Sequence, residues 1–429
     1  MNQRVIPIAC LAASCFPHPA FASVPPKQDV AGGAGSTLRA PWTERRVDHG
    51  IVSTASLRLL ADCDSDRADR LVRRVVRTRG LAGDLFGHLV LRRPDTPVLL
   101  LFESPEDMVF TVRTSLAVSE PTLPAEAVLR SNGPTLAACT GFASILGLER
   151  ALQAEAFKQF MMPRCPEGIA PWAMHGLAEY FGAILFDGDR LDPGLAPPDL
   201  CLSVQKALGN DRLVPINRLA QLDQEGWAHF EKVHGPMAMR AQAWSLVHFM
   251  LHGGPGELRE RFLRWFEQTC SGNDPFGSFE ATILGGSRGS SFEVLEGFWR
   301  SSIGGLEPSP VHVAVEMAEL LATCLETMES EGVRPSDLGA MESLIRDLPE
   351  IELETRSGPC TRVLSSHDVG WLDIARLRFE AGPVRAPGSA GAPPAIWITM
   401  PGDWEIGVTW TRRVSDGAWR STVVRRRAS

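Results

Sequence analysis

Apolar positions recur at two different spacings in the first part of the chain. Continuous apolar runs lie in STASLRLLAD, residues 53–62, and in TPVLLLF, residues 96–102, and such runs are typical of buried β-strands. Between them, DRADRLVRRVVRTRGLAGDLF predicts a helix, because apolar residues lie at helical spacing on one face. These residues are Ala68, Leu71, Val72, Val75 and Val76. The order strand, helix, strand predicts a β-α-β unit at the start of the fold.

The pattern is mainly helical from about residue 141 to 300. One helix is predicted over Leu148–Met162, because the chain meets Pro163 directly afterwards. A second helix is predicted to begin at Pro171, where the missing amide hydrogen leaves no helical hydrogen bond unmade. Core-facing positions of the first helix are Leu152, Ala156 and Phe160, with Ala154 and Lys158 on a neighbouring face.

A second region follows from residue 306 to 429. VHVAVEMAELLATCLETMESEG and PSDLGAMESLIRDL have helical periodicity, and WITM, WEIGVTWTRRV and AWRSTVVRRR predict strands. Ser415-Asp416-Gly417 suits a hairpin turn between the last two strands. The sequence therefore predicts a small α+β region at the C-terminus.

The first residues are typical of an export signal. Arg4 precedes an apolar run, and Ala20-Phe21-Ala22 offers small residues at the cleavage positions. We therefore expect a signal peptide over residues 1–22, a spacer rich in Pro, Gly, Ala and Ser over 23–44, and a periplasmic or extracellular protein. A lipid anchor at Cys15 is a weaker alternative. No later stretch reaches the roughly 20 apolar residues of a membrane span.

Composition narrows the function classes. The chain is 44% hydrophobic and 22% charged, which is typical of a globular protein. Its formal charge of -8 argues against general binding to nucleic acid or to an anionic membrane. Seven cysteines follow the predicted signal without any Cys-x-x-Cys spacing, so most are interpreted as buried apolar residues, with at least one thiol left unpaired within the chain.

The helix that begins at Pro171 carries a distinctive motif, PWAMHGLAEYF. With the helix before it, this motif resembles the zinc-site core of the peptidase MA-like, or gluzincin, metallopeptidases, specifically an exported branch of that family. The resemblance extends over about residues 50 to 300, including VLLLFESPEDM, LVPINRL and AQAWSLVHFMLHG. It implies a gluzincin-like α+β domain over residues 45–305, with the smaller α+β region at 306–429.

The metal ligands of that family are not preserved. In a His-Glu-x-x-His helix, two imidazoles bind zinc and the Glu is the general base. The resemblance aligns the two ligand positions with Ala154 and Lys158, and the general base with Glu155. The third ligand, normally Glu, is His175. Alanine has no donor atom and lysine is a cation near neutral pH, so we expect no cofactor, a vestigial general base and an inactive peptidase.

Three hypotheses remain for the function. In the first, Lys158 takes the electrostatic place of the metal by pairing with Glu155 or Glu179 across the two helices, or it simply extends to solvent; the cleft then binds a peptide or protein. In the second, His175, Glu179 and Glu155 hold zinc in a non-standard site, helped by a distant His234 or His248, and the chain is an active metallopeptidase. In the third, the C-terminal region binds a partner.

Overall fold

The computed structural model describes the chain between residues 43 and 427, with gaps. The described ranges are 43–47, 57–61, 65–87, 97–104, 128–130, 135–139, 145–165, 169–187, 190–254, 256–285, 292–330, 332–347, 351–355, 360–364, 377–380, 393–400, 404–412 and 419–427, with single positions 63, 89, 107, 108 and 111. The predicted signal peptide and the alternative anchor at Cys15 lie outside these ranges. The first strand begins at Thr43, two residues before the predicted start of the first domain at residue 45.

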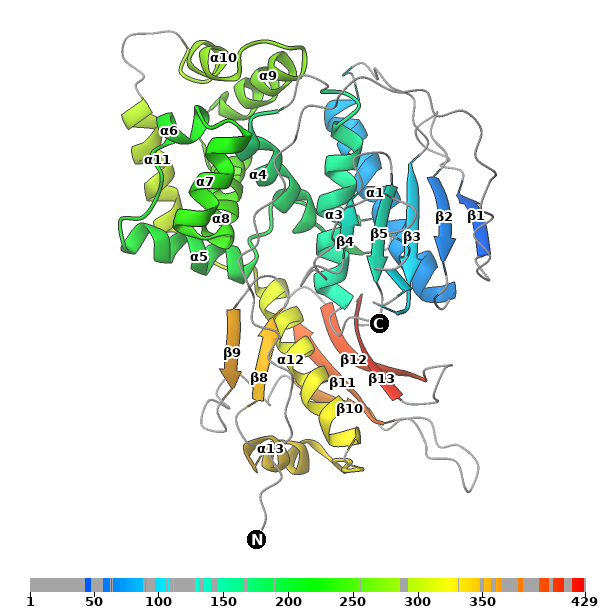
Figure 1. The fold of residues 1–429 in the computed structure, drawn as a ribbon. Helices are drawn as coiled ribbons and strands as arrows, with labels where there is room; N and C mark the ends of the chain where they lie inside the picture. Colours follow the sequence, from blue (N-terminus) through cyan, green and yellow to red (C-terminus); the bar gives the residue numbers. More distant parts are fainter. Residues whose placement is uncertain are drawn as a thin grey trace.

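A five-stranded sheet forms one layer of the first part of the chain, in the order β1-β2-β3-β5-β4 (Figure 1). Its strands are β1 (Thr43–Val47), β2 (Leu57–Ala61), β3 (Val98–Phe102), β4 (Val128–Arg130) and β5 (Thr135–Cys139). Strands β2, β3 and β5 run parallel, whereas β1 and β4 are antiparallel to their neighbours. Helix α1 (Ser65–Phe86) connects β2 to β3, so the predicted β-α-β unit is confirmed.

Helices α1 and α3 (Ile145–Met161) share a core with this sheet. Leu71 and Val75 of α1, Leu152 of α3, and Leu99 and Leu101 of β3 belong to one buried cluster. Each such side chain stabilises the fold by roughly 1.5–3 kcal/mol when it leaves water. The predicted apolar face of α1 is therefore confirmed, and α3 extends three residues before the predicted helix and ends one residue earlier.

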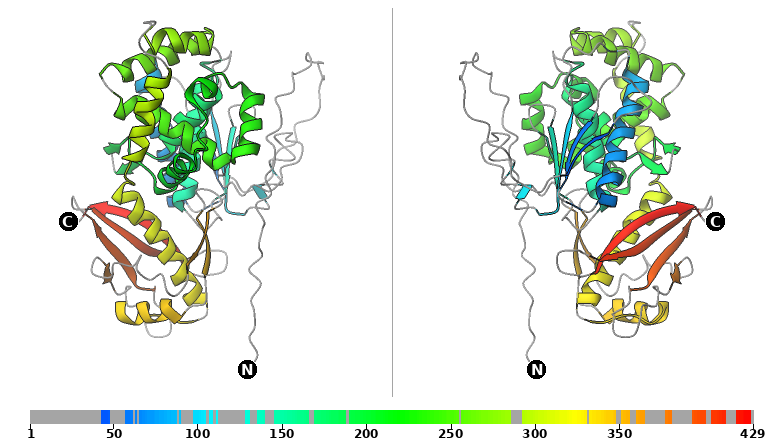
Figure 2. Two further views of the ribbon diagram at one scale, coloured as in Figure 1. Left: turned by 90° about the vertical axis from the view of Figure 1, so that its left-hand side faces the viewer. Right: turned by 90° about the vertical axis from the view of Figure 1, so that its right-hand side faces the viewer.

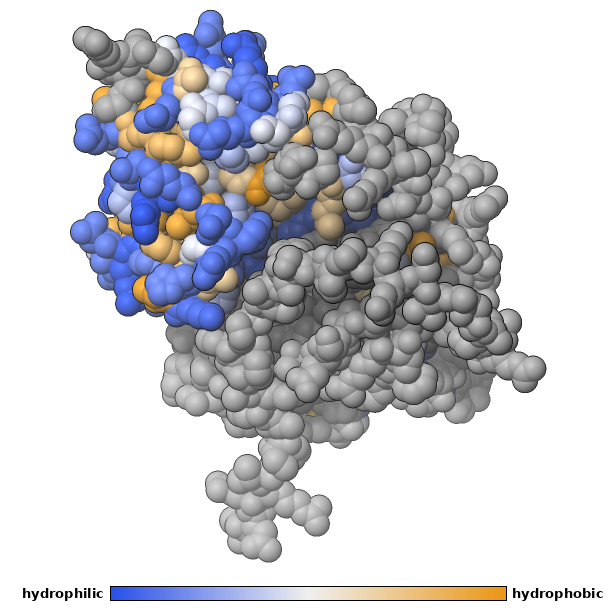
Figure 3. Space-filling view, turned by 45° about the horizontal axis from the view of Figure 1, so that its top comes forward, coloured by the Kyte–Doolittle hydropathy of each residue, from blue (hydrophilic) through white to orange (hydrophobic). Residues whose placement is uncertain are grey.

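The middle of the chain is mainly helical, as predicted. Its elements are α4 (Pro171–Gly182), α5 (Pro198–Gly209), α6 (Ile216–Ala220), α7 (Gln224–His234), α8 (Pro236–His248), the π-helical turn η1 (Phe249–Gly253), α9 (Leu258–Cys270), α10 (Pro275–Thr282) and α11 (Phe292–Gly304). The exception is a hairpin of β6 (Leu185–Asp187) and β7 (Arg190–Asp192) that the helical pattern did not predict. Figure 3 shows hydrophilic and apolar residues interspersed over the surface of the described residues.

Helix α4 packs closely against α8. A Cβ atom on Gly176 would lie 2.5 Å from the backbone oxygen of Ala243 and 2.7 Å from Val247 Cγ2. Real side chains do not tolerate such separations, so a glycine is required where these two helices touch. The glycine of the PWAMHGLAEYF motif thus sets the distance between the site helix and the helical core.

Aromatic rings fill the core around the start of α4. Trp172 stacks on Trp265 of α9 with ring centroids 5.1 Å apart, and both are fully buried. A disulfide between Cys165 and Cys270 joins the segment after α3 to the end of α9. Cys201 and Cys324 are free thiols, and these two residues and Cys139 are buried as the sequence predicts.

The C-terminal region is α+β, as predicted. Its elements are α12 (Pro310–Ser330), α13 (Leu338–Asp347), β8 (Ile351–Thr355), β9 (Cys360–Leu364), β10 (Leu377–Glu380), β11 (Ala395–Met400), β12 (Trp404–Arg412) and β13 (Trp419–Arg427). Strands β10 to β13 form an antiparallel sheet in chain order, and β8 pairs with β9. The sequence predicted β11, β12 and β13 but not β8 to β10. The predicted turn at 415–417 lies outside the described residues.

Helix α12 lies across one face of the C-terminal sheet (Figure 2). Ala318 and Leu321 of α12 share a buried cluster with Ile396, Ile406 and Val408. Polar contacts fix the register of this packing, since the Glu326 carboxylate accepts hydrogen bonds from the backbone nitrogen and the hydroxyl of Ser421 on β13. Among the described residues, no helix is long and apolar enough to cross a membrane.

The first turn of α12 also contacts the preceding part of the chain. The Ser309 amide donates to the Ala196 carbonyl at 2.8 Å, and the Gln205 side-chain amide donates to the Leu306 carbonyl at 2.8 Å. His312 Nε2 lies 3.1 Å from the Ala183 carbonyl oxygen and donates to it, because a carbonyl can only accept. The C-terminal region is therefore joined to the end of α4 by buried hydrogen bonds.

Removal of the disulfide is predicted to lower the free energy of unfolding. The Cys165–Cys270 bond closes a loop of 105 residues, and losing a native cross-link of this kind costs about 2–5 kcal/mol. Urea unfolding of Cys165→Ala measures the loss. Wild type treated with a thiol reductant is expected to match the variant. Equal midpoints for Cys165→Ala and untreated wild type would show that the bond does not form in solution.

Acidification is predicted to destabilise the fold through His312. Burial, followed by the nearby charges of Arg150 and Arg425, lowers the pKa of His312 from 6.5 to about 3. Since the unfolded chain binds this proton more readily, the stabilisation is complete above about pH 6.5 and is lost as the pH falls toward 3. Between pH 7 and 5 the loss is about 1–2 kcal/mol. Urea unfolding at both pH values measures it, and His312→Gln should unfold with a shallower pH dependence. An unchanged pH dependence in His312→Gln would contradict this assignment.

Candidate functional site

Helices α3 and α4 bring together the positions that the zinc-peptidase resemblance singles out. Pro171 is the first residue of α4, as predicted, and this helix has no side-chain cap at Ala170. Its opposite end is held by Gln153 of α3, whose buried side-chain amide lies 2.9–3.1 Å from three backbone carbonyls, those of Phe181, Gly182 and Ile184. Because terminal helix carbonyls lack partners within the helix, Gln153 fixes where α4 ends relative to α3.

Glu155, at the general-base position of the resemblance, is paired with Lys158, at its second ligand position. Lys158 Nζ lies 2.6 Å from Glu155 Oε1, and the two side chains are 16% and 20% exposed. They are three residues apart on α3, so the ion pair is contained in one helix. Lys158 thus neither extends into solvent nor bridges the two helices, and of its two predicted partners it contacts Glu155.

The first ligand position offers no donor and little space. Ala154 is 9% exposed and belongs to the large apolar cluster of the helical part. A Cβ atom on Gly182 of α4 would lie 3.4 Å from the Ala154 Cβ. A histidine ring at position 154 would therefore have to displace part of the contact between α3 and α4.

The third ligand position, His175, is engaged with an aromatic ring. Its imidazole stacks on the Trp227 indole of α7, with centroids 4.9 Å apart and planes 5° from parallel. Glu179, one turn later on α4, instead contacts Arg150 of α3 at 3.1 Å. In the part of the chain that the structure describes, His, Cys, Asp and Glu side chains form no group of three that could hold a metal ion. His175, Glu179 and Glu155 therefore do not fit a zinc site in this arrangement.

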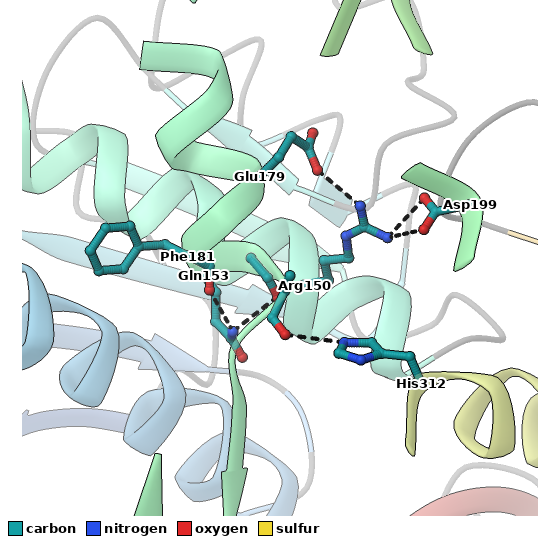
Figure 4. A network of polar contacts seen from close by, with 8 residues as sticks. Arg150, Gln153, Glu179, Phe181, Asp199 and His312 are labelled. Carbon is teal, nitrogen blue, oxygen red and sulfur yellow. Dashed lines mark hydrogen bonds and ion pairs between the residues drawn. The ribbon is translucent and has the colours of Figure 1, made fainter. Parts of the chain in front are cut away.

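Arg150 links three helices around the site (Figure 4). Its Nη1 lies 2.8 Å from both carboxylate oxygens of Asp199 on α5, and its Nη2 lies 3.1 Å from Glu179 Oε2. Burial alone lowers the pKa of Arg150, but Asp199 and Glu179 raise it by more, so the net pKa lies above its ordinary value. The guanidinium is a permanent cation shared by two carboxylates.

Sequence reasoning missed Arg150 and Asp199. Two adjacent charged residues, Glu149 and Arg150, in the otherwise apolar start of α3, ILGLERAL, were the available signal for Arg150. Its partners lie 29 and 49 residues away in the sequence, and helical periodicity carries no information about contacts at that separation.

A second polar group surrounds Tyr180, the only tyrosine of the chain. Its hydroxyl lies 2.9 Å from Nε2 of His252 in η1, and burial raises the pKa of the phenol to about 12. His248 Nε2 donates to the Gly194 carbonyl at 2.9 Å, and burial lowers the pKa of His248. His234 stacks on Phe230 within α7, with centroids 5.5 Å apart. His248 and His234 are thus held by contacts with neighbouring residues.

No protein-family model, curated protein or solved structure matches this chain. Function is therefore inferred from the arrangement of its side chains.

Replacement of Arg150 is predicted to destabilise the protein strongly. Arg150→Met leaves Glu179 and Asp199 without their shared cation, and breaking a buried ion pair costs about 3–5 kcal/mol. Arg300 is the matched control, because it contacts Glu296 at 2.8 Å but is 30% exposed on α11. Arg300→Met should cost about 1 kcal/mol or less. Urea unfolding at pH 7 separates the two variants, and equal losses would mean that the Arg150 contacts contribute no more than a surface pair.

Proposed function

We propose that this chain is an exported, metallopeptidase-like protein that does not hydrolyse peptides and acts by binding an extended peptide or protein segment. The observation that carries the proposal is the ion pair between Lys158 and Glu155, with 2.6 Å between Nζ and Oε1. These two residues occupy the positions where a gluzincin requires a neutral imidazole ligand and a free general base.

The chemistry of the pair favours loss of hydrolysis. Zinc lowers the pKa of a bound water to about 7, and the adjacent carboxylate then accepts its proton. An ammonium group can neutralise the Glu155 carboxylate but provides no vacant coordination position for a water molecule. The Glu179 carboxylate is likewise neutralised by Arg150. Both acidic groups of the motif are therefore stabilised without a metal.

The edge of the first sheet supports peptide binding next to α3. Among the described strands, β4 pairs only with β5, to which it is antiparallel, and it contacts α3. A strand edge can receive an extended peptide by adding it to the sheet, with main-chain hydrogen bonds providing affinity. The predicted groove lies between β4 and the face of α3 that carries Glu155 and Lys158.

The disulfide supports the proposed export. Disulfides persist in oxidising compartments and are rare in the reducing cytosol. The Cys165–Cys270 bond connects the segment after α3 to the end of α9, so an oxidising compartment would stabilise the part of the fold that contains the site.

Metal binding and hydrolysis test the proposal together. Purified protein is incubated with zinc, dialysed, and analysed for metal content and for cleavage of fluorescently labelled casein. Wild type should retain less than about 0.1 zinc per chain, which is roughly the background of adventitious binding. It should not cleave the casein. The same measurements on Ala154→His combined with Lys158→His and His175→Glu show whether the fold still accommodates a metal. Fluorescence anisotropy with labelled, unfolded casein then measures peptide binding.

Stoichiometric zinc in wild type would overturn the proposal if Glu155→Ala or His175→Ala removes it. His229→Ala is the control, because His229 is an exposed histidine on α7 outside the site. Zinc-dependent cleavage that is lost in Glu155→Ala would establish the alternative, an active metallopeptidase with His175, Glu179 and Glu155 at its metal. Absence of both zinc and casein binding would remove peptide binding from the proposal.

A further inference from the structure

A cavity of about 290 Å³ lies where the C-terminal region meets the first part of the chain. Its walls come from α1, the start of α3, the segment from Gly182 to Phe186, the first turns of α12, and β13. Glu155, Lys158 and His175 do not line it. The volume lies at the lower end of the range of small-molecule sites, which is about 300–1,000 Å³. The cavity is therefore separate from the vestigial metal site.

Positive charge predominates in the cavity wall. Four arginines line it, Arg70, Arg74, Arg150 and Arg425, against two glutamates, Glu149 and Glu316. Arg150 is shared behind the wall by Asp199 and Glu179, so these three side chains together carry one negative charge. The other charged side chains of the wall, three arginines against two glutamates, carry one positive charge. The lining side chains themselves thus differ in sign from the whole chain, which has a formal charge of -8.

Among the arginines of the cavity wall, Arg70 is the one whose charge is available to bind an anion. Arg74 contacts Glu149 at 3.2 Å and donates to the Phe186 carbonyl at 3.1 Å. Arg70 lies one turn earlier on α1, and it forms no hydrogen bond or ion pair with another described residue. Its side chain is half-buried. A guanidinium in such a position is well suited to bind a carboxylate or phosphate through two parallel hydrogen bonds.

His312 supplies an acceptor in the same cavity. Its Nε2 carries the hydrogen donated to the Ala183 carbonyl, so Nδ1 of the neutral ring bears a lone pair. Nδ1 is buried and forms no hydrogen bond with any other residue that the structure describes. Burial lowers the pKa of His312 to about 3, so the ring stays neutral at pH 7. A buried acceptor of this kind is usually satisfied by a water or by a donor group of a ligand.

We propose that this cavity binds a small organic oxyanion, a carboxylate or phosphate that also carries a hydroxyl group. Arg70 binds the anionic oxygens, and the ligand hydroxyl donates to His312 Nδ1. Arg74 stays paired with Glu149 and keeps that carboxylate from repelling the ligand. The site is independent of the proposed peptide groove, because it uses no residue of that groove.

Isothermal titration calorimetry of the full chain tests this with four probes: L-malate, succinate, glycerol 3-phosphate and propyl phosphate. Malate differs from succinate by one hydroxyl, and glycerol 3-phosphate differs from propyl phosphate only by its two hydroxyls, so each pair isolates the His312 contact. We expect one hydroxylated probe to bind more tightly than its partner, by about tenfold, as expected for one hydrogen bond in a buried site. The pair that shows this difference identifies whether the anionic group is a carboxylate or a phosphate.

Matched variants assign the contacts. Arg70→Gln should weaken the bound probe by about 10- to 100-fold, as expected for a hydrogen-bonded charged group. Arg73→Gln is the control, because Arg73 is exposed on the same helix and does not line the cavity, and it should change affinity less than about twofold. His312→Leu removes the Nδ1 acceptor together with the donor to the Ala183 carbonyl, so it should abolish the preference for the hydroxylated probe in protein that circular dichroism shows to be folded.

Three outcomes would overturn the proposal. The first is that all four probes give no more heat than sodium chloride of equal ionic strength. The second is that Arg70→Gln and Arg73→Gln bind equally well while circular dichroism shows both to be folded. The third is that hydroxylated and non-hydroxylated probes bind wild type alike, which would leave the His312 acceptor to a water molecule.

Discussion

A buried arginine shared by two carboxylates sets the geometry of the centre of this protein. Arg150 of α3 holds Glu179 of α4 and Asp199 of α5 within 2.8–3.1 Å. A buried charge is tolerated only when it is paired and hydrogen-bonded, so neither α4 nor α5 can move away from α3 without leaving a charge unpaired. Ala183, directly after α4, accepts a hydrogen bond from His312 in the first turn of α12, and Gln205 on α5 donates to the Leu306 carbonyl in the segment before α12. The position of the C-terminal region, and with it the cavity, therefore depends on the same three side chains.

The sequence predicts elements of this fold more reliably than their contacts. The β-α-β opening, the start of α4 at Pro171, and helices α12 and α13 follow from periodicity and from proline placement, which are local properties. Strands β8 and β10 do alternate apolar and polar residues, as IELET and LRFE, so a short signal for them was present in the sequence and was not recognised. The pairing of Cys165 with Cys270 spans 105 residues, and seven cysteines permit too many pairings for spacing to select one.

Some contacts of the candidate site can likewise be predicted from the sequence, and others cannot. The contact between Lys158 and Glu155 is predictable, because residues three apart lie side by side on a helix. The stacking of His175 on Trp227 and the pairing of Glu179 with Arg150 are not, because they depend on how α7 and α3 pack around α4. Two residues one turn apart on a helix can thus have unrelated partners. For this reason His175 and Glu179 looked like a metal pair in the sequence and are separately engaged in the structure.

Charge balance explains how such a site can lose a metal and stay folded under the proposed function. A divalent ion brings two positive charges to an α3–α4 pair that carries Glu155 and Glu179. Lys158 and Arg150 also bring two, one to Glu155 and one that Glu179 shares with Asp199. The carboxylates remain neutralised, yet the capacity to activate water is lost, because an ammonium or guanidinium group has no coordination position for it. Under the same proposal, the packing of Ala154 against Gly182 opposes a histidine at position 154, since that side chain would have to displace part of the contact between the two helices.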